Sequence, residues 1–105
     1  FLSDKFNNKI KTFSRKIKAF PKLVEWDNSK TRWGVCTSKG TIKINYRALM
    51  LPEHLLDYII IHEICHLLQF NHSSLFWAEV EKICPSYKQC KSEIKHYSFL
   101  LELYR

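Results

Sequence analysis

The pattern of apolar and polar positions changes period along the chain, beginning with a helical one. Over the first twenty residues, apolar side chains recur at steps of four and three: Phe6, Ile10, Phe13, Ile17 and Phe20. This spacing predicts an amphipathic helix. Pro21 ends it, because proline has no backbone N–H with which to continue the helix.

Three short strands are predicted next, over residues 22–26, 32–37 and 41–47. The last of them has the clearest alternation, with one face formed by Ile42, Ile44 and Tyr46 and the other by Lys43, Asn45 and Arg47. The segment 38–40 is predicted to be a hairpin connection, because its glycine is free to adopt a positive φ.

The remainder of the chain reads as helical. From Pro52 to about Phe70, apolar residues cover most of the circumference of a helix, which predicts a central, buried helix. A short helix after Ser73 is predicted to bury Phe76, Trp77, Val80 and Ile83. A last helix is predicted from Ser86, where Ser86-x-x-Gln89 matches a capping box. The expected class is α+β, a small antiparallel sheet packed by three or four helices.

Length and composition limit the class of protein. The 105 residues are 46% hydrophobic, with seven Phe, five Tyr and three Trp, so residues 1–105 are expected to form one folded domain. No signal peptide is evident, and the apolar runs are too short to span a membrane. We expect a soluble, cytoplasmic protein with no membrane partner. Its four cysteines lack a C-x-x-C spacing, so buried free thiols are expected rather than the disulfides of a small secreted protein.

The net charge of +7 is concentrated in the N-terminal half. The cations of the first helix are Lys5, Lys9, Lys11, Arg15, Lys16 and Lys18. This surplus has two interpretations: a surface that contacts nucleic acid, or a solvated helix face without a partner.

The central helix carries ionisable groups within an apolar run, Y-I-I-I-H-E-I-C-H at residues 58–66. A buried imidazole or carboxylate needs compensation. His62 and His66 are four residues apart and therefore share one helix face, from which they can bind one metal ion. Glu63 lies one step round, within reach of a water on that metal. This is the H-E-x-x-H pattern of zinc hydrolases, which predicts one Zn²⁺ per chain.

A catalytic zinc takes a third protein ligand. His72 is the favoured candidate, because its offsets from the other two histidines match the long pattern H-E-x-x-H-x-x-G-x-x-H. Gln69 occupies the glycine position of that pattern, so Asn71 is expected to help turn the chain in the left-handed region. Glu79 is the competing third ligand. Met50 precedes the helix, so a metzincin-type Met-turn after the ligands is excluded.

Three segments together resemble the YgjP-like zinc metallopeptidases, relatives of the SprT-like and WLM proteases. They read RWGVCTSKGTIKINYR, LPEHLLDYIIIHEICHL and NHSSLFWAEVEKICPSY, and the resemblance covers about residues 30–90. It implies a zincin-like fold with an HExxH active-site helix. The sequence departs from the family pattern at Val35, where serine is usual, and it lacks the N-terminal β-rich segment that family members carry, which indicates a fragment.

The expected function is hydrolysis of peptide bonds by a zinc-activated water, with Glu63 as general base. An extended peptide or protein substrate is expected to add to the sheet along residues 40–47. Oxyanion stabilisers remain open among Arg32, Asn45, Tyr87 and His96. The alternative is a zinc-containing module that binds nucleic acid or protein without catalysis; Glu63 argues against it, because a structural site gains little from a carboxylate there.

Overall fold

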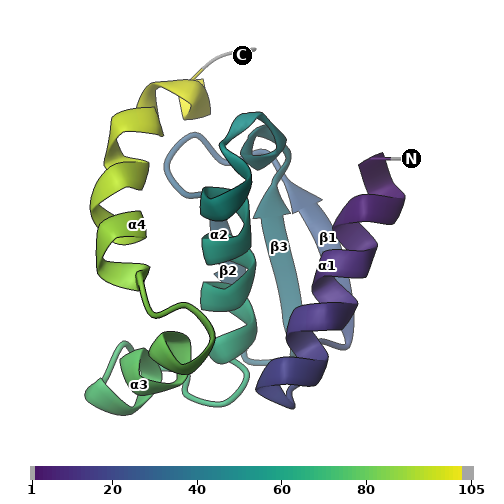
Figure 1. Ribbon diagram of the computed structural model, residues 1–105. Helices are drawn as coiled ribbons and strands as arrows, with labels where there is room; N and C mark the ends of the chain where they lie inside the picture. Colours follow the sequence, from purple (N-terminus) through teal and green to yellow (C-terminus); the bar gives the residue numbers. More distant parts are fainter. Residues whose placement is uncertain (1, 103–105) are drawn as a thin grey trace.

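A three-stranded sheet and one central helix organise the structure (Figure 1). The computed structural model describes residues 2–102. In chain order the elements are α1 (Leu2–Ile17), β1 (Leu23–Asp27), β2 (Gly34–Cys36), β3 (Thr41–Asn45), the 3₁₀ helix η1 (Tyr46–Met50), α2 (Glu53–Cys65), α3 (Ser74–Ile83), α4 (Tyr87–Glu93) and the 3₁₀ helix η2 (Ile94–Glu102). The predicted α+β class is confirmed.

The sheet is mixed, so the prediction of a wholly antiparallel sheet is wrong. The strand order is β1-β3-β2, with β2 antiparallel to β3 and β1 parallel to β3. After β1 the chain crosses to the far edge of the sheet, and β3 then fills the middle. Alternation in the sequence shows which residues are extended, but not which strands become neighbours.

The crossing between β1 and β2 explains why the alternation predicted for residues 41–47 stops at Ile44. Asn45 is fully buried, and its Nδ2 donates to the carbonyl oxygens of Ser29 and Arg32 at 2.7 and 3.1 Å. Arg47 is 1% exposed and lies in the 3₁₀ helix η1 instead of the strand. Two residues predicted to face solvent are therefore buried, because the connecting loop is fixed over the end of β3.

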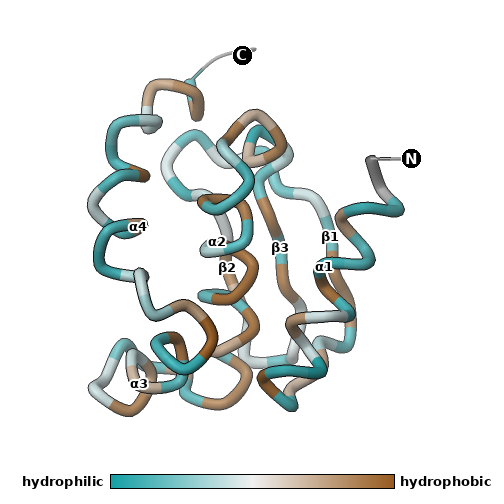
Figure 2. The backbone as a smooth tube through the Cα atoms, in the orientation of Figure 1, coloured by the Kyte–Doolittle hydropathy of each residue, from teal (hydrophilic) through white to brown (hydrophobic). Residues whose placement is uncertain are grey.

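The central position predicted for the main helix is confirmed. In Figure 1, α1 and α2 lie across one face of the sheet, and α4 lies beside α2 on the side away from α1. Figure 2 shows hydrophobic residues concentrated along α2 and β3. The fully buried side chains of α2 include Leu55, Ile60 and Ile64, which belong to one core cluster together with residues of the sheet and of the other helices.

Two helix ends differ from the prediction. The helix α2 ends at Cys65 instead of about Phe70, and hydrogen bonds from residues 66–68 to the carbonyls three residues earlier tighten the chain into a turn. The helix α1 ends at Ile17, and Lys18 adopts the left-handed region with φ 64°. Phe20 therefore leaves the predicted apolar stripe and is 66% exposed.

Smaller expectations have mixed outcomes. All four cysteines are free thiols, as predicted. Ser86 begins α4, but its side chain makes no capping hydrogen bond, so the capping-box prediction is wrong. None of the helices in the described part of the chain has the length and apolar character that crossing a bilayer requires.

Candidate functional site

The end of α2 and the segment after it bring three histidines together. His62 lies on the last full turns of α2, His66 is its C-cap residue, and His72 lies just before α3. One ring nitrogen from each lies within 4.8 Å of the others. His66 is buried, His62 is half-buried and His72 is exposed, so the cluster lies at the surface of the core and not inside it.

The turn that returns His72 to the helix is made by 3₁₀ hydrogen bonds. Leu67 N donates to Ile64 O at 2.9 Å and Leu68 N donates to Cys65 O at 3.0 Å. The expectation that Asn71 takes the left-handed region is wrong, because Lys18 is the only non-glycine residue with positive φ among residues 2–102. A glycine is therefore not needed at position 69.

His66 is oriented by the same turn. Its Nδ1 lies 3.2 Å from the carbonyl oxygen of Gln69, and its Nε2 lies 3.1 Å from the Nε2 of His72. A carbonyl oxygen only accepts, so the ring hydrogen is on Nδ1 and the lone pair on Nε2. Burial and the neighbouring His62 lower the pKa of His66, and the same two causes lower the pKa of His72. Both rings are therefore neutral at pH 7, the form that binds metals.

Two aromatic residues of α3 form a wall behind the histidines. Phe76 stacks on His66, with ring centroids 4.3 Å apart, and packs edge-on against His62 and His72 at 5.1 Å each. Trp77 stacks on His72 at 6.0 Å. The sequence predicted both aromatics as core residues only. Nothing in the apolar pattern of α3 distinguishes a residue that faces the histidines from one that faces the core.

Glu63 is enclosed between α2 and β2. It is 5% exposed, and its Oε2 lies 3.1 Å from Nδ1 of His62. Its side chain lies directly against the backbone of Gly34, where an added Cβ would be 3.0 Å from Glu63 Cγ and 3.1 Å from Oε2. This contact was not foreseen, because glycine carries no pattern that indicates a partner on a distant helix.

A cleft of about 260 Å³ opens in front of these groups. It is lined by the three histidines and Glu63 together with Gly34, Val35, Cys36 and Phe70. The strand beside the cleft is thus β2, an edge strand, and not β3. Since β3 has a neighbour on each side, the prediction that a peptide adds along residues 40–47 is wrong.

Other predicted site residues lie elsewhere. Glu79 pairs with Lys82 on α3 at 3.2 Å and does not join the histidine cluster. Among the oxyanion candidates, Asn45 holds the loop after β1 and Arg32 pairs with Asp27 at 3.0 Å. Tyr87 stacks on Trp77 outside the cleft, and His96 is exposed on η2. None of these four lines the cleft.

The basic residues of α1 divide into two groups. Lys9 is enclosed by Glu53 and Asp57, each at 2.7 Å, and Lys5 lies 3.5 Å from Glu53. These two join α1 to α2. The remaining cations of α1 and its end are exposed: Lys11, Arg15, Lys16 and Lys18.

Three imidazoles that converge beside an open cleft, with a carboxylate one helical step away, fit a metal ion that keeps a position free for chemistry. On an α+β fold, that arrangement defines a metal-dependent hydrolase. A model of the YgjP-like metallopeptidase domain matches residues 2–97, and the chain belongs to the YgjP-like metallopeptidase family. The resemblance read from the sequence is confirmed, and peptides or proteins are the substrates.

A solved structure agrees with this assignment. The fold is similar to the crystal structure of the metallopeptidase zymogen abylysin of Pyrococcus abyssi, with a TM-score of 0.79 and 28% sequence identity. The match covers 87% of this chain and 92% of that one. A search of curated protein sequences finds no match.

Proposed function

We propose that this metallopeptidase holds one Zn²⁺ per chain on His62, His66 and His72 and uses Glu63 as general base. The observation that carries the proposal is the convergence of three imidazole nitrogens within 4.8 Å beside a buried carboxylate. The helix α2 and the non-helical segment before α3 together supply these side chains.

The donor set supports zinc. Imidazole nitrogen is a preferred zinc ligand, and two nitrogens bound tetrahedrally at about 2.05 Å lie about 3.3 Å apart. The Nε2 atoms of His66 and His72 are separated by 3.1 Å. The contact from His66 Nδ1 to Gln69 O is the outer-shell bond that typically fixes a metal-binding histidine.

When bound, zinc supplies Lewis acidity, which lowers the pKa of a water towards 7 and polarises the scissile carbonyl. The chain's own part is proton transfer. Glu63 Oε2 accepts the proton of the attacking water and returns it to the nitrogen of the leaving amine. Its position between His62 and Gly34 limits its freedom, so the carboxylate is already oriented before the substrate arrives.

The free edge of β2 supplies the substrate-binding backbone. Hydrogen bonds from Thr37 N to Thr41 O and from Asn45 N to Trp33 O set the alternation along the hairpin. The backbone N–H and C=O groups of Val35 therefore point towards β3, while those of Gly34 and Cys36 point to the open edge of the sheet. An extended peptide can pair there as an added strand, with its scissile bond next to the histidines.

A cytoplasmic location is also proposed. Thiols persist in reducing compartments, and all four cysteines are free.

The buried thiols near the site are not nucleophiles. Burial raises the pKa of Cys36 to about 11, and the nearby Glu63 adds to the shift. Burial also raises the pKa of Cys65 to about 12, and Glu79 adds to that shift. Neither thiol is an alternative nucleophile at neutral pH.

Metal analysis of the purified protein, combined with a casein or peptide-library digest, tests the proposal. We expect about one zinc per chain, lost in His72→Ala and retained in Glu79→Ala, together with peptide hydrolysis that a chelator abolishes. Retention of full stoichiometry in His72→Ala, with loss in Glu79→Ala, would show that the third ligand is assigned wrongly. Zinc binding without hydrolysis of any peptide would favour the non-catalytic module.

A further inference from the structure

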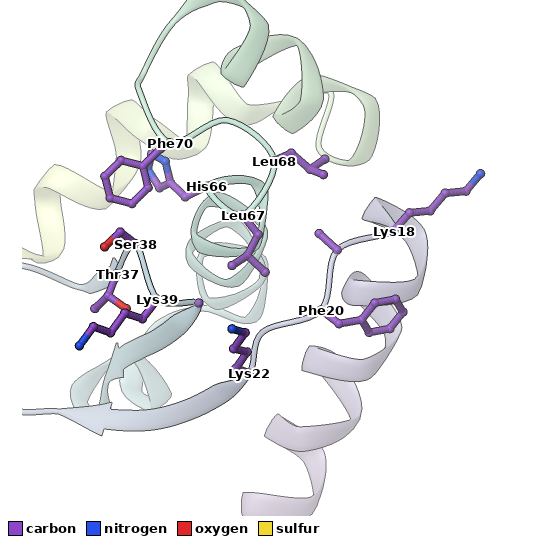
Figure 3. Close-up of a pocket in the computed structure, with 12 residues that line it drawn as sticks. Lys18, Phe20, Lys22, Thr37, Ser38, Lys39, His66, Leu67, Leu68 and Phe70 are labelled. Carbon is purple, nitrogen blue, oxygen red and sulfur yellow. The ribbon is translucent and has the colours of Figure 1, made fainter.

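A second, larger hollow adjoins the catalytic cleft. Its volume is about 630 Å³, within the range of ligand-binding pockets, and it shares His66 and Phe70 with the cleft. Figure 3 shows Phe70 in front of His66 at one end of this hollow, with Leu67 and Leu68 further along. A peptide that leaves the histidines in this direction enters the hollow directly.

The hollow presents apolar surface to solvent. Phe70 is 57% exposed, Leu68 is 40% exposed and Phe20 is 66% exposed. Phe20 and Phe70 are fifty positions apart in the sequence, yet they line the same hollow. Large apolar groups left exposed in one concave place indicate a binding surface.

Cations surround this apolar surface. Lys22 and Lys39 line the hollow, and in Figure 3 Lys22 reaches towards Leu67 while Lys39 lies beside Thr37. Lys18 is at the far rim and points away. A third hollow, of about 440 Å³, shares Phe20 and Lys22 and adds Lys11 and Arg15. Among the residues that the structure describes, no carboxylate lines either of these two hollows.

We propose that this basic groove, formed by the two hollows, selects extended substrate peptides that carry an apolar residue near the scissile bond and acidic residues beyond it. The proposal rests on the function proposed above and names its substrate class. Phe70 and Leu67 contact the apolar side chain, and Lys22 and Lys39 pair with the carboxylates. Arg15 and Lys11 extend the positive field along the same path.

An acidic peptide fits the groove better than a nucleic acid does, because the groove continues the line of the edge strand. A peptide paired with Gly34 and Cys36 passes Thr37 and Lys39 next, so main-chain pairing and charge pairing act on one occupant. The apolar part of the groove begins at the cleft, where a side chain beside the scissile bond must be placed.

The test uses two quenched fluorescent peptide pools with the same randomised apolar centre. One pool carries Glu and Asp on both flanks, and the other carries Gln and Asn. We expect kcat/KM to be about 2- to 30-fold higher for the acidic pool, since two partly exposed ion pairs contribute that much. Added salt should reduce the difference.

Charge reversal locates the effect. Lys22→Glu with Lys39→Glu should remove the preference for acidic flanks, whereas Lys88→Glu with Lys95→Glu, which changes the net charge equally on α4 and η2, should keep it. If the first pair folds poorly, as judged by circular dichroism, Lys22→Gln with Lys39→Gln replaces it. Equal loss in both double variants would show a general effect of net charge and overturn the proposal.

Binding separates this proposal from the catalytic one. Glu63→Gln protein is titrated with both pools and with a single-stranded oligonucleotide, and anisotropy is measured. Tighter binding of the acidic pool supports the groove, even if the wild type hydrolyses nothing and the proposed function fails. Equal binding of both pools overturns the groove as an acidic-peptide site. Binding of the oligonucleotide alone, lost in the Lys22 and Lys39 variants, would assign the groove to nucleic acid instead.

Discussion

Glu63 is a buried carboxylate enclosed between His62 and Gly34. A carboxylate that is 5% exposed pays a desolvation penalty that an amide would not. Glu63→Gln keeps the size and the helix propensity of the side chain, but the amide cannot accept a proton. We predict that peptide hydrolysis falls by at least about 10²–10⁴-fold, while zinc content stays at wild-type level. Paired activity assays and metal analysis measure this.

The melting temperature of Glu63→Gln gives an independent check. It should equal or slightly exceed that of the wild type, because a buried charge has been removed. Loss of zinc from this variant, or unchanged hydrolysis, would remove Glu63 from the role of base.

Gly34 is the position where a single methyl group should disturb the base. An added Cβ would lie 3.0 Å from Glu63 Cγ and 3.1 Å from the backbone oxygen of Lys43, and the latter cannot move without shifting β3. We predict that Gly34→Ala lowers kcat about 10- to 100-fold by displacing the carboxylate. Zinc content should be unchanged, since none of the three atoms nearest to the added Cβ belongs to a histidine.

Ser92→Ala, at an exposed position of α4 that lines neither the cleft nor the groove, is the control for Gly34→Ala and should retain kcat. If kcat of Gly34→Ala matched that of the control, the contact with Glu63 would have no catalytic importance.

For individual residues, the sequence predicted those members of the candidate site that lie close together in the chain. His62, Glu63 and His66 follow from the geometry of one helix, and His72 follows closely enough to be a candidate. Gly34 could not be predicted as part of the site, because its role comes from contact with Glu63, a residue nearly thirty positions away in the sequence. Phe76 could be predicted as apolar but not as a stacking partner, since a core residue and a residue behind a ligand have the same pattern.

The pairing of α1 with α2 depends on one lysine. Lys9 Nζ lies 2.7 Å from both Glu53 Oε2 and Asp57 Oδ1, and its side chain is 13% exposed. Burial opposes the charge, but hydrogen bonds to Asp57 and Glu53 more than compensate and raise the pKa of Lys9. We predict that Lys9→Met lowers the free energy of unfolding by about 1–2 kcal/mol at pH 7, measured by urea denaturation. Lys11→Met, on the exposed face, should change it by less than about 0.5 kcal/mol.

The pH dependence of the Lys9 effect follows from the same contacts. A raised lysine pKa stabilises the fold below the unfolded value of 10.5, and this contribution is lost as pH rises through the folded pKa. The hydrogen bond from Lys9 lowers the pKa of Glu53. The contribution of Glu53 to stability is therefore present above pH 4.5, and it is lost as the pH falls through the pKa of Glu53 in the folded state. The difference between wild type and Lys9→Met should therefore be largest near neutral pH. A difference that persists at pH 3 would contradict the ion-pair explanation.

Among the elements, helices were predicted more reliably than the sheet. Periodicity located α1, α2 and α3, because each buries one side or all of its surface. It did not reveal the parallel pairing of β1 with β3, which depends on a loop that crosses the end of the sheet. The same loop explains why Asn45 and Arg47 are buried, although the sequence pattern placed both on the polar face of the strand. Hydrogen bonds to a distant loop leave no trace in the alternation of a strand.

For the whole molecule, bound metal should contribute to stability without being required for the fold. The core contains fully buried side chains from β3, α2 and α3, including Ile44, Leu55 and Val80, none of which lines the cleft. At free zinc about 100-fold above Kd, binding stabilises the native state by at most about 2.7 kcal/mol. In a domain of this size that raises the melting temperature by roughly 10–20 °C, which calorimetry with and without a chelator measures.

His96→Ala provides the matched control, since this exposed histidine lies on η2 outside the cluster. It should keep the zinc-dependent rise in melting temperature, whereas His66→Ala should lose it. A rise that is the same in both variants would place the stabilising metal elsewhere.

The short distance in sequence between the three histidines has a consequence for folding order. His62 and His72 are ten positions apart, so a helical turn and a reverse turn suffice to bring their rings near each other. Closing such a loop has a small entropic cost, so we expect that a partly folded chain can already bind a metal ion with these histidines. Enclosure of Glu63 is different, because it requires the hairpin to dock on the helix. We therefore expect the proposed metal site to form before the proposed catalytic site, because only the latter needs the long-range contact between the hairpin and α2.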